Sequence, residues 1–392
     1  MLLALPVFAD RVSDWQDDIR FFGTELPKRH KNFFTVGTRA EFDAAVARLE
    51  ADVPELADHQ IKVRLMELAA FGHDAHTGLS LVGLTPLPIE MVWLRDGLYI
   101  TRVASGHAEA AGGRVVAIGG RPIAEALDAV RRIIPYENEW WLRYRAPLYL
   151  MFTELLAGSG ITDRLDGARF EVERPDGTHL DFDLPSGSLR AGDPSWPDPP
   201  PLFRQQTTVN YWRTTIGSDT VYFAYNICND MPSQSLAAFA KEMWAAVDRD
   251  RPARLIIDLR NNLGGSSSLF APIVTGLQSR PWLNQRGRVF AFIGRATFSS
   301  GMFAAIDLRK GTNAILIGEP TGGSPNSFGE IVSFILPHSR LQVLYSTKSF
   351  SLLPNGELTV EPDVRVEPSA ADWAAGRDPV LLAAFPPRRR AM

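Results

Sequence analysis

A length of 392 residues exceeds what one hydrophobic core usually serves, so two or three domains are expected. The net charge of -4 at pH 7 argues against a nucleic-acid partner, which would require a basic face. Because Cys228 is the only cysteine, the sequence excludes an internal disulfide and a cysteine-based zinc site. It also contains no apolar run long enough for a transmembrane helix.

The first ten residues, MLLALPVFAD, are mostly apolar. They match the remnant of a signal peptide, although no basic region precedes them, and they match an ordinary apolar N-terminus equally well. The cysteine content does not fix the redox compartment. This segment therefore favours an extracytoplasmic location, periplasmic or secreted, over a cytoplasmic one.

Helical periodicity dominates the start of the chain. Apolar residues recur at helical spacing between residues 12 and 81, where glycine is scarce, and Gly72 provides a natural stop. This pattern predicts an N-terminal helical domain over residues 1–84.

Short strands and tight turns follow from about residue 86. The predicted elements are strands at 97–100 and 115–118, a helix at 123–134, and a strand pair at 170–184 divided by the turn sequence Pro-Asp-Gly. They define a second domain over residues 85–186. Closely spaced prolines then predict an extended linker over residues 187–206.

Strands and helices alternate from residue 207 to residue 392. The predicted elements are buried strands at 221–225, 255–257, 289–293 and 314–317, with helices at 235–249 and 302–308. Continuous apolar strands separated by helices indicate a parallel sheet that is covered on both faces. The segment 207–392 is therefore predicted to form an α/β core.

Two polar segments follow predicted strands of this core. Asp258 to Gly265 (DLRNNLGG) ends in paired glycines, which either direct backbone N–H groups toward an oxyanion or form a plain turn. Ser299 lies in the sequence ATFSSG between a strand and a helix, at the edge where open parallel sheets place their sites. A serine at this position is either a helix cap or a nucleophile favoured by the helix dipole.

Two further segments are candidates for chemistry. Gly72 to Gly78 (GHDAHTG) offers a general base for a distant serine, a metal site of His73, Asp74 and His76, or two solvated loop histidines. Gly318 to Ser324 (GEPTGGS) is either a turn or a loop that lines the same cleft as the serine in ATFSSG.

In this order the motifs resemble the tail-specific, or C-terminal-processing, serine protease family, which includes the core of tricorn protease and the repeats of interphotoreceptor retinoid-binding protein. The segments that carry the resemblance are GHDAHTG, IIDLRNNLGG, TFSSG, IGEPTGG, VEPDV at 360–364 and GRDPVL at 376–381. The resemblance covers most of the chain and implies a crotonase/ClpP-like α/β catalytic core. Residues 96–124 resemble the PDZ-like domain of the family, which binds extended peptides, so the implied partner is a peptide or protein substrate.

The resemblance also implies site residues. Register with the segment GEPT places the nucleophile at Ser299, with Ser300 as the less favoured alternative. It places the oxyanion hole at the backbone N–H groups of Gly264, Gly265 and Ser300.

The general base is where the sequence departs from the family. The C-terminal-processing branch uses a lysine at the position of Ser324, whereas the tricorn-like branch uses a histidine that matches His76. A serine precedes that histidine in the tricorn-like branch, but this chain has Ala75 there. The supporting acid is Glu361 or Glu357, with Glu361 preferred.

The sequence therefore predicts a serine-type peptidase that acts through an acyl-enzyme on Ser299, with His76 as base and Glu361 as acid, and without a metal or organic cofactor. Two alternatives remain open. The first is a catalytically decayed peptide- or small-ligand-binding protein on the same fold, favoured by Ala75 and the missing lysine. The second is a metal hydrolase built on the histidines of GHDAHTG. The substrate and the oligomeric state do not follow from the sequence.

Overall fold

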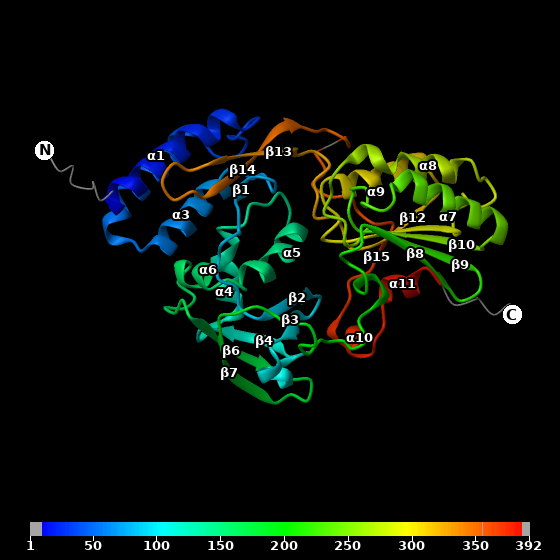
Figure 1. The fold of residues 1–392 in the computed structure, drawn as a ribbon, viewed down its shortest axis with the longest axis horizontal. Coiled ribbons are helices and arrows are strands. Elements are labelled where there is room, and N and C mark those ends of the chain that lie inside the picture. The colour runs from blue at the N-terminus through cyan, green and yellow to red at the C-terminus, as the bar shows by residue number, and fades with distance from the viewer. Residues whose placement is uncertain (1–9, 355, 386–392) are drawn as a thin grey trace, which may run out of the picture.

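The computed structural model describes residues 10–354 and 356–385, and this part of the chain forms three β-sheets. Figure 1 shows an α/β lobe on one side and, on the other, an antiparallel sheet next to a group of N-terminal helices. The segment interpreted as a possible signal-peptide remnant lies, up to residue 9, outside the described residues.

Three helices follow one another at the N-terminus, as the periodicity predicts: α1 (Arg11–Arg29), α2 (Arg39–Asp52) and α3 (Asp58–Ala70). The start of α2 is fixed by a capping box, in which the side chain of Thr38 accepts from the N–H of Glu41 and the carboxylate of Glu41 accepts from the N–H of Thr38. The last helix ends two residues before Gly72, close to the predicted stop.

A hairpin from late in the chain joins this helical region. Strand β1 (Gly78–Leu79) pairs antiparallel with β14 (Gln342–Ser349), which pairs antiparallel with β13 (Phe328–Ile335). In Figure 1 the orange hairpin lies beside the blue N-terminal helices. The carboxylate of Asp18 on α1 accepts the N–H groups of His338 and Ser339 at the tip of the hairpin. Residues 328–349 therefore lie away from the α/β sheet that the sequence pattern predicts for 207–392.

The middle of the chain forms a mainly antiparallel sheet. Its strands are β2 (Ile89–Leu94), β3 (Gly97–Val103), β4 (Arg114–Ile118), β6 (Gly167–Glu173) and β7 (His179–Pro185), in that spatial order, with β5 (Arg121–Pro122) on β4. The helices are α4 (Ile123–Arg131), α5 (Glu139–Tyr149) and α6 (Thr153–Gly158). The predicted turn joins β6 to β7, and Gly177 takes a φ of 80° there.

The helical region and the antiparallel sheet share one hydrophobic core. Ile19 and Phe22 of α1 belong to the same buried cluster as Phe170 of β6 and Leu184 of β7, and Val343 of β14 joins them. The predicted boundary between residues 84 and 85 therefore does not separate two cores.

The α/β lobe contains the predicted parallel sheet. Its order is β15 (Val364–Arg365), β12 (Ile315–Gly318), β11 (Val289–Ile293), β10 (Arg254–Asp258), β9 (Thr220–Tyr225) and β8 (Tyr211–Ile216). All neighbours are parallel except β8, which pairs antiparallel with β9. Helices α7 (Leu236–Asp250), α8 (Ala271–Gln278) and α9 (Ser300–Gly311) bury one face of the sheet. Helix α11 (Pro379–Ala383) packs on the other face, preceded by α10 (Ala370–Ala374).

A buried ion-pair network ties the C-terminal helix to the sheet. The guanidinium of Arg260, just after β10, contacts Asp258 at 2.6 Å and Asp378 at 2.8 Å. Asp378 also caps α11 through the N–H groups of Val380 and Leu381. Two residues of the sequence motifs, Asp258 and Asp378, are therefore structural. Among the described helices, none combines the length and the apolar character that a membrane crossing requires.

Candidate active site

Ser299 occupies a strained turn between β11 and α9. Its backbone has φ 49° and ψ -127°, a conformation that a residue with a side chain adopts only at a cost of about 1–3 kcal/mol. It stands at the N-cap position of α9, but its side chain makes no capping hydrogen bond. The hydroxyl of Ser300, in contrast, donates to the carbonyl of Gly265 at 2.7 Å. Of the two serines, Ser299 is the one whose hydroxyl makes no hydrogen bond within the described residues.

Glycines hold this turn because no side chain fits beside it. A Cβ on Gly264, whose φ is 112°, would lie 2.7 Å from Cβ of Ser299. A Cβ on Gly323 would lie 3.1 Å from the backbone nitrogen of Ser299. The loops DLRNNLGG and GEPTGGS therefore both pack directly against the serine, and Gly323 and Ser324 line the same cleft.

The backbone donors around Ser299 are not equivalent. The N–H of Gly264 donates to Oδ1 of Asn262 at 2.9 Å, so it is already occupied. For the N–H groups of Gly265 and Ser300, the structure of residues 10–354 and 356–385 records no acceptor. Two of the three predicted oxyanion donors are thus unoccupied.

His76 reaches the same cleft from the other lobe. The cleft has a volume of about 520 Å³ and is lined by Ser299, His76 and the loops around them. The imidazole packs on Phe298, with ring centroids 4.4 Å apart, and Phe298 stacks on Trp141 at 3.8 Å. Both ring nitrogens of His76 are buried, and within the described residues neither has a hydrogen-bond partner, Ser299 included.

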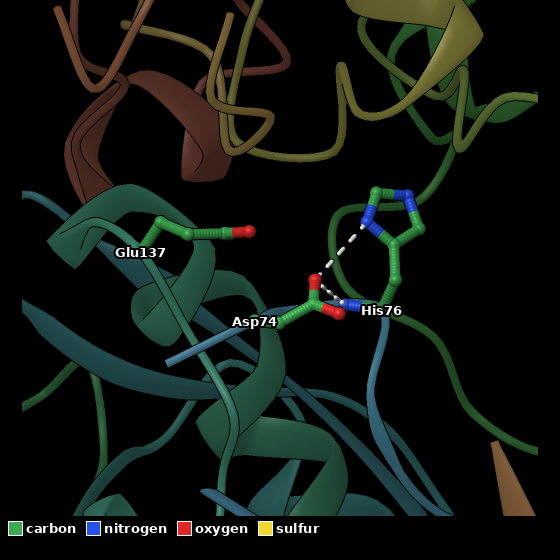
Figure 2. Close-up of side chains that lie close together, drawn as sticks. All are labelled: Asp74, His76 and Glu137. Carbon is green, nitrogen blue, oxygen red and sulfur yellow. Dashed lines mark hydrogen bonds and ion pairs between the residues drawn. The ribbon is translucent and has the colours of Figure 1, made fainter. Parts of the chain in front are cut away.

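The carboxylates beside His76 are not those that the sequence predicts. Figure 2 shows Asp74 and Glu137 next to the imidazole, and Oδ1 of Asp74 lies 3.6 Å from Nδ1. Glu361 is exposed, and its carboxylate accepts from the hydroxyl of Thr359 at 2.8 Å. No ion pair or hydrogen bond among the described residues links Glu361 or the exposed Glu357 to His76.

Asp74 is the most heavily bonded carboxylate in this region. Its Oδ2 accepts from Nε2 of His30 at 3.0 Å and from the hydroxyls of Thr77 and Ser346, each at 2.6 Å. Its Oδ1 accepts the N–H of His76 at 3.0 Å. Burial by itself would raise the pKa of Asp74, but the neighbouring His30, His76 and Ser346 outweigh burial and hold the pKa well below its usual value.

The pKa of Glu137 is shifted in the opposite direction from that of Asp74. Its Oε1 accepts the N–H of Ala75 at 3.1 Å, while its Oε2 is out of solvent contact and has no partner within the described residues. Burial, followed by the nearby charge of Asp74, raises the pKa of Glu137 well above its usual value. The residue as a whole is only partly buried, although its Oε2 is out of solvent contact.

The possible metal ligands in the structure differ from the set that the sequence suggests. Donor atoms of Asp74, His76 and Glu137 lie within 4.8 Å of one another, whereas His73 is exposed and outside this cluster. Two carboxylates and an imidazole form a ligand set suited to a divalent cation, but Asp74 already accepts four hydrogen bonds. A metal-based reaction would therefore require Glu137 in place of His73.

The lysines do not occupy the position used by the C-terminal-processing branch. Ser324 stands there, and its hydroxyl donates to the carbonyl of Asn326 at 3.3 Å. Lys348 on β14 lines the cleft, but its ammonium is largely exposed and lies 3.6 Å from Glu330. Lys310 sits in the last turn of α9 and donates to the carbonyl of Leu352.

The fold of this chain is similar to that of solved structures, whereas its sequence matches no known family. No family model matches the sequence, and no curated protein matches it. Mature CPAF complexed with lactacystin aligns with a TM-score of 0.65 at 12% identity, covering 93% of this chain and 96% of that chain. A second structure of mature CPAF aligns with a TM-score of 0.62 at 11% identity, covering 93% of this chain and 94% of that chain. Tricorn protease aligns over 95% of this chain and 36% of its own, at 15% identity and a TM-score of 0.46. The chain therefore has the fold of mature CPAF.

Replacing Asp74 by asparagine is expected to destabilise the protein at pH 7 by about 2–4 kcal/mol, because a buried charged acceptor of several hydrogen bonds is lost. The pKa of Asp74 is lowered on folding, so its contribution is present above the unfolded value of about 3.9 and declines as the pH falls below it. Urea midpoints of the wild type and D74N should converge in acid. Asp43→Asn, on the exposed face of α2, is the control and should shift little. Equal midpoints at pH 7 would contradict the assignment.

Glu137→Gln is expected to stabilise the protein increasingly as the pH rises. A raised pKa means that the unfolded chain releases the Glu137 proton before the folded chain does, so the wild type loses stability above about pH 4.3. Glutamine retains an acceptor for the N–H of Ala75 and carries no charge. Thermal melting from pH 5 to pH 8 measures the difference, and a variant that loses stability with pH as steeply as the wild type would refute the buried neutral acid.

Proposed function

We propose that this protein is a serine-type peptidase of the tail-specific kind, with Ser299 as its nucleophile. The observation that carries the proposal is that Ser299 and His76, which come from different lobes, line one cleft. The strained backbone and uncapped hydroxyl of Ser299 support it, since such strain is typical of catalytic turns. The CPAF-like fold supplies a precedent among proteases.

In the proposed reaction, Oγ of Ser299 attacks the carbonyl carbon of the scissile peptide bond while His76 takes the hydroxyl proton. The oxyanion receives hydrogen bonds from the N–H groups of Gly265 and Ser300, and each such donor is worth about 3 kcal/mol in the barrier. His76 then gives its proton to the leaving amine as the C–N bond breaks. Water, deprotonated by His76, attacks the acyl carbon. The acyl–Oγ bond then breaks, Oγ of Ser299 takes the proton back from His76, and the new carboxyl terminus leaves.

Asp74 takes the role of supporting acid in this proposal, in place of Glu361. Its carboxylate stays ionised and faces Nδ1 of His76 at 3.6 Å, so it favours the imidazolium that forms during attack. The serine that the tricorn-like branch places before the histidine is Ala75 here, and Glu137 holds its N–H instead. The loop that carries His76 is thus fixed through its backbone.

We further propose that residues 85–186 act as a PDZ-like domain that presents extended peptides to the cleft. The antiparallel sheet of β2 to β7 with α4 supports this proposal. PDZ domains bind peptides by adding a strand to a sheet edge.

A second candidate function is peptide or small-ligand binding without catalysis. The specific observation that favours it is the lack of a hydrogen bond between His76 and Ser299 in the described structure. Catalytic hydrogen bonds often tighten only when substrate is bound, so this gap does not rule out the peptidase.

A fluorophosphonate probe separates the two candidates. The wild type is expected to gain one covalent adduct at Ser299, measured by intact mass and peptide mapping. Ser299→Ala should abolish labelling and peptide hydrolysis. Ser300→Ala should still label, because its backbone N–H is retained, but more slowly, because the hydroxyl bond to the carbonyl of Gly265 is lost. Absence of labelling in a folded wild type supports the binding protein. Labelling of Ser299→Ala but not of Ser300→Ala would assign the nucleophile to Ser300.

The base is tested by His76→Ala and Lys348→Ala, both of which line the cleft. Removing the proton acceptor is expected to lower peptide turnover by about 10³-fold or more, while Lys348→Ala should change it less than about threefold. Progress curves with a fluorogenic peptide provide the measurement. Activity lost in Lys348→Ala and retained in His76→Ala would assign the base to the lysine.

A further inference from the structure

A second cavity, separate from the cleft of Ser299, lies where the two lobes meet. It has a volume of about 420 Å³. One wall comes from β2 and α5 of the antiparallel lobe, and the other from the loops that follow β10, β11 and β12. The segment around Phe203 and Arg204, from the proline-rich linker, and Trp373 of α10 complete it. The linker is thus part of a built cavity and not merely a spacer.

The charges that face this cavity are mostly positive. They are Arg143, Arg204, Arg260, Arg295 and Glu319. Three of the four guanidinium groups have acidic partners: Arg260 pairs with Asp258 and Asp378, Arg295 with Glu319, and Arg143 lies 3.7 Å from Glu367. Glu319 is therefore already neutralised by Arg295.

Arg204 is the exception. Its guanidinium lies over the ring of Trp373 at 5.2 Å, and within the described residues it has neither an ion pair nor a hydrogen bond. Desolvation lowers the pKa of Arg204, and the nearby charge of Glu90 offsets only part of that shift. The guanidinium is half-buried, and a partly desolvated cation is stabilised when an anion joins it.

Two more donors in the same wall lack acceptors. Nε of Arg295 is buried and unsatisfied, although the two terminal nitrogens of that guanidinium bond to Glu319 and to the carbonyl of Trp93. The hydroxyl of Tyr144 lines the cavity and makes no hydrogen bond within the described residues. A buried donor is normally paired, so Nε of Arg295 indicates a missing acceptor, and the hydroxyl of the half-buried Tyr144 is a second donor that lines the same cavity.

We propose that this cavity binds a carboxylate attached to an apolar or aromatic group. The guanidinium of Arg204 pairs with the carboxylate, and the planar fork of arginine matches its two oxygens. Tyr144 and Nε of Arg295 supply further hydrogen bonds, while Trp93 and Trp373 enclose the apolar body.

The position of the cavity connects it to the proposed chemistry. Leu263 lines both the cavity and the cleft of Ser299, and it directly precedes the glycines that pack on the serine. Ala296, three residues before Ser299, belongs to the cavity wall. The carboxylate thus belongs either to the substrate peptide or to a separate small acid that contacts the active-site loops. A substrate peptide as the source of the carboxylate rests on the proposed peptidase function, whereas the binding of a carboxylate in this cavity does not.

The test uses the full chain carrying Ser299→Ala, so that no turnover occurs and binding is measured independently of catalysis. The probes are 4-phenylbutyrate and its amide, and a peptide with a C-terminal phenylalanine as the free acid and as the amide. Isothermal titration calorimetry is expected to show at least one of the two acids binding at least tenfold more tightly than its matched amide. Tighter binding of the peptide acid identifies the substrate as the source, and tighter binding of phenylbutyrate identifies a separate ligand.

Arg204→Gln is expected to weaken acid binding at least tenfold, and Tyr144→Phe severalfold. Arg48→Gln, an exposed arginine on α2, is the matched control and should leave affinity unchanged. Thermal melting checks that each variant is folded. If Arg204→Gln does not fold, the affinity of Tyr144→Phe and the comparison of acids with amides test the proposal. Equal affinity for acids and amides, absence of binding by both acids, or full affinity in folded Arg204→Gln overturns the proposal.

Discussion

The arrangement of the candidate site depends on one buried carboxylate. Asp74 accepts hydrogen bonds from His30 at the end of α1, from Ser346 on β14, and from Thr77 and His76 in its own loop. Three parts of the chain that are distant in sequence are thereby fixed to one charge. Because an unpaired buried anion is costly, the bonds that stabilise Asp74 also determine where β14 lies and how His76 faces the cleft.

A steric constraint acts on the other side of the cleft. The turn at Ser299 is strained, and it persists because Gly264, which leaves no room for a Cβ, and Gly323, which leaves little room for one, pack against it. The same loops continue into the cavity between the lobes, where Arg295 bonds both to Glu319 and to the carbonyl of Trp93 on β2. Ser299, the loops that pack against it and the lobe interface are therefore parts of one packed unit.

Much of the fold follows from local patterns. The helical spacing at the N-terminus, the Pro-Asp-Gly turn and the apolar strands of the parallel sheet all correspond to observed elements. The position of the hairpin of β13 and β14 does not follow from such patterns. The hairpin pairs with β1, and this pairing joins residues more than 250 positions apart in the sequence. No local pattern encodes a partner at that separation, and the shared core across residue 84 is hidden for the same reason.

For the candidate site, the sequence by itself determined which segments are candidates for chemistry, because strand-end polar loops and paired glycines are local signals. It predicted Ser299 and His76, which the structure brings to one cleft. Only the tertiary structure decided that the acids beside His76 are Asp74 and Glu137, while Glu361 is exposed elsewhere. The physical reason is that a pKa shift and an ion pair depend on burial and on distances across the fold. The spacing of residues along the sequence determines neither the burial nor these distances.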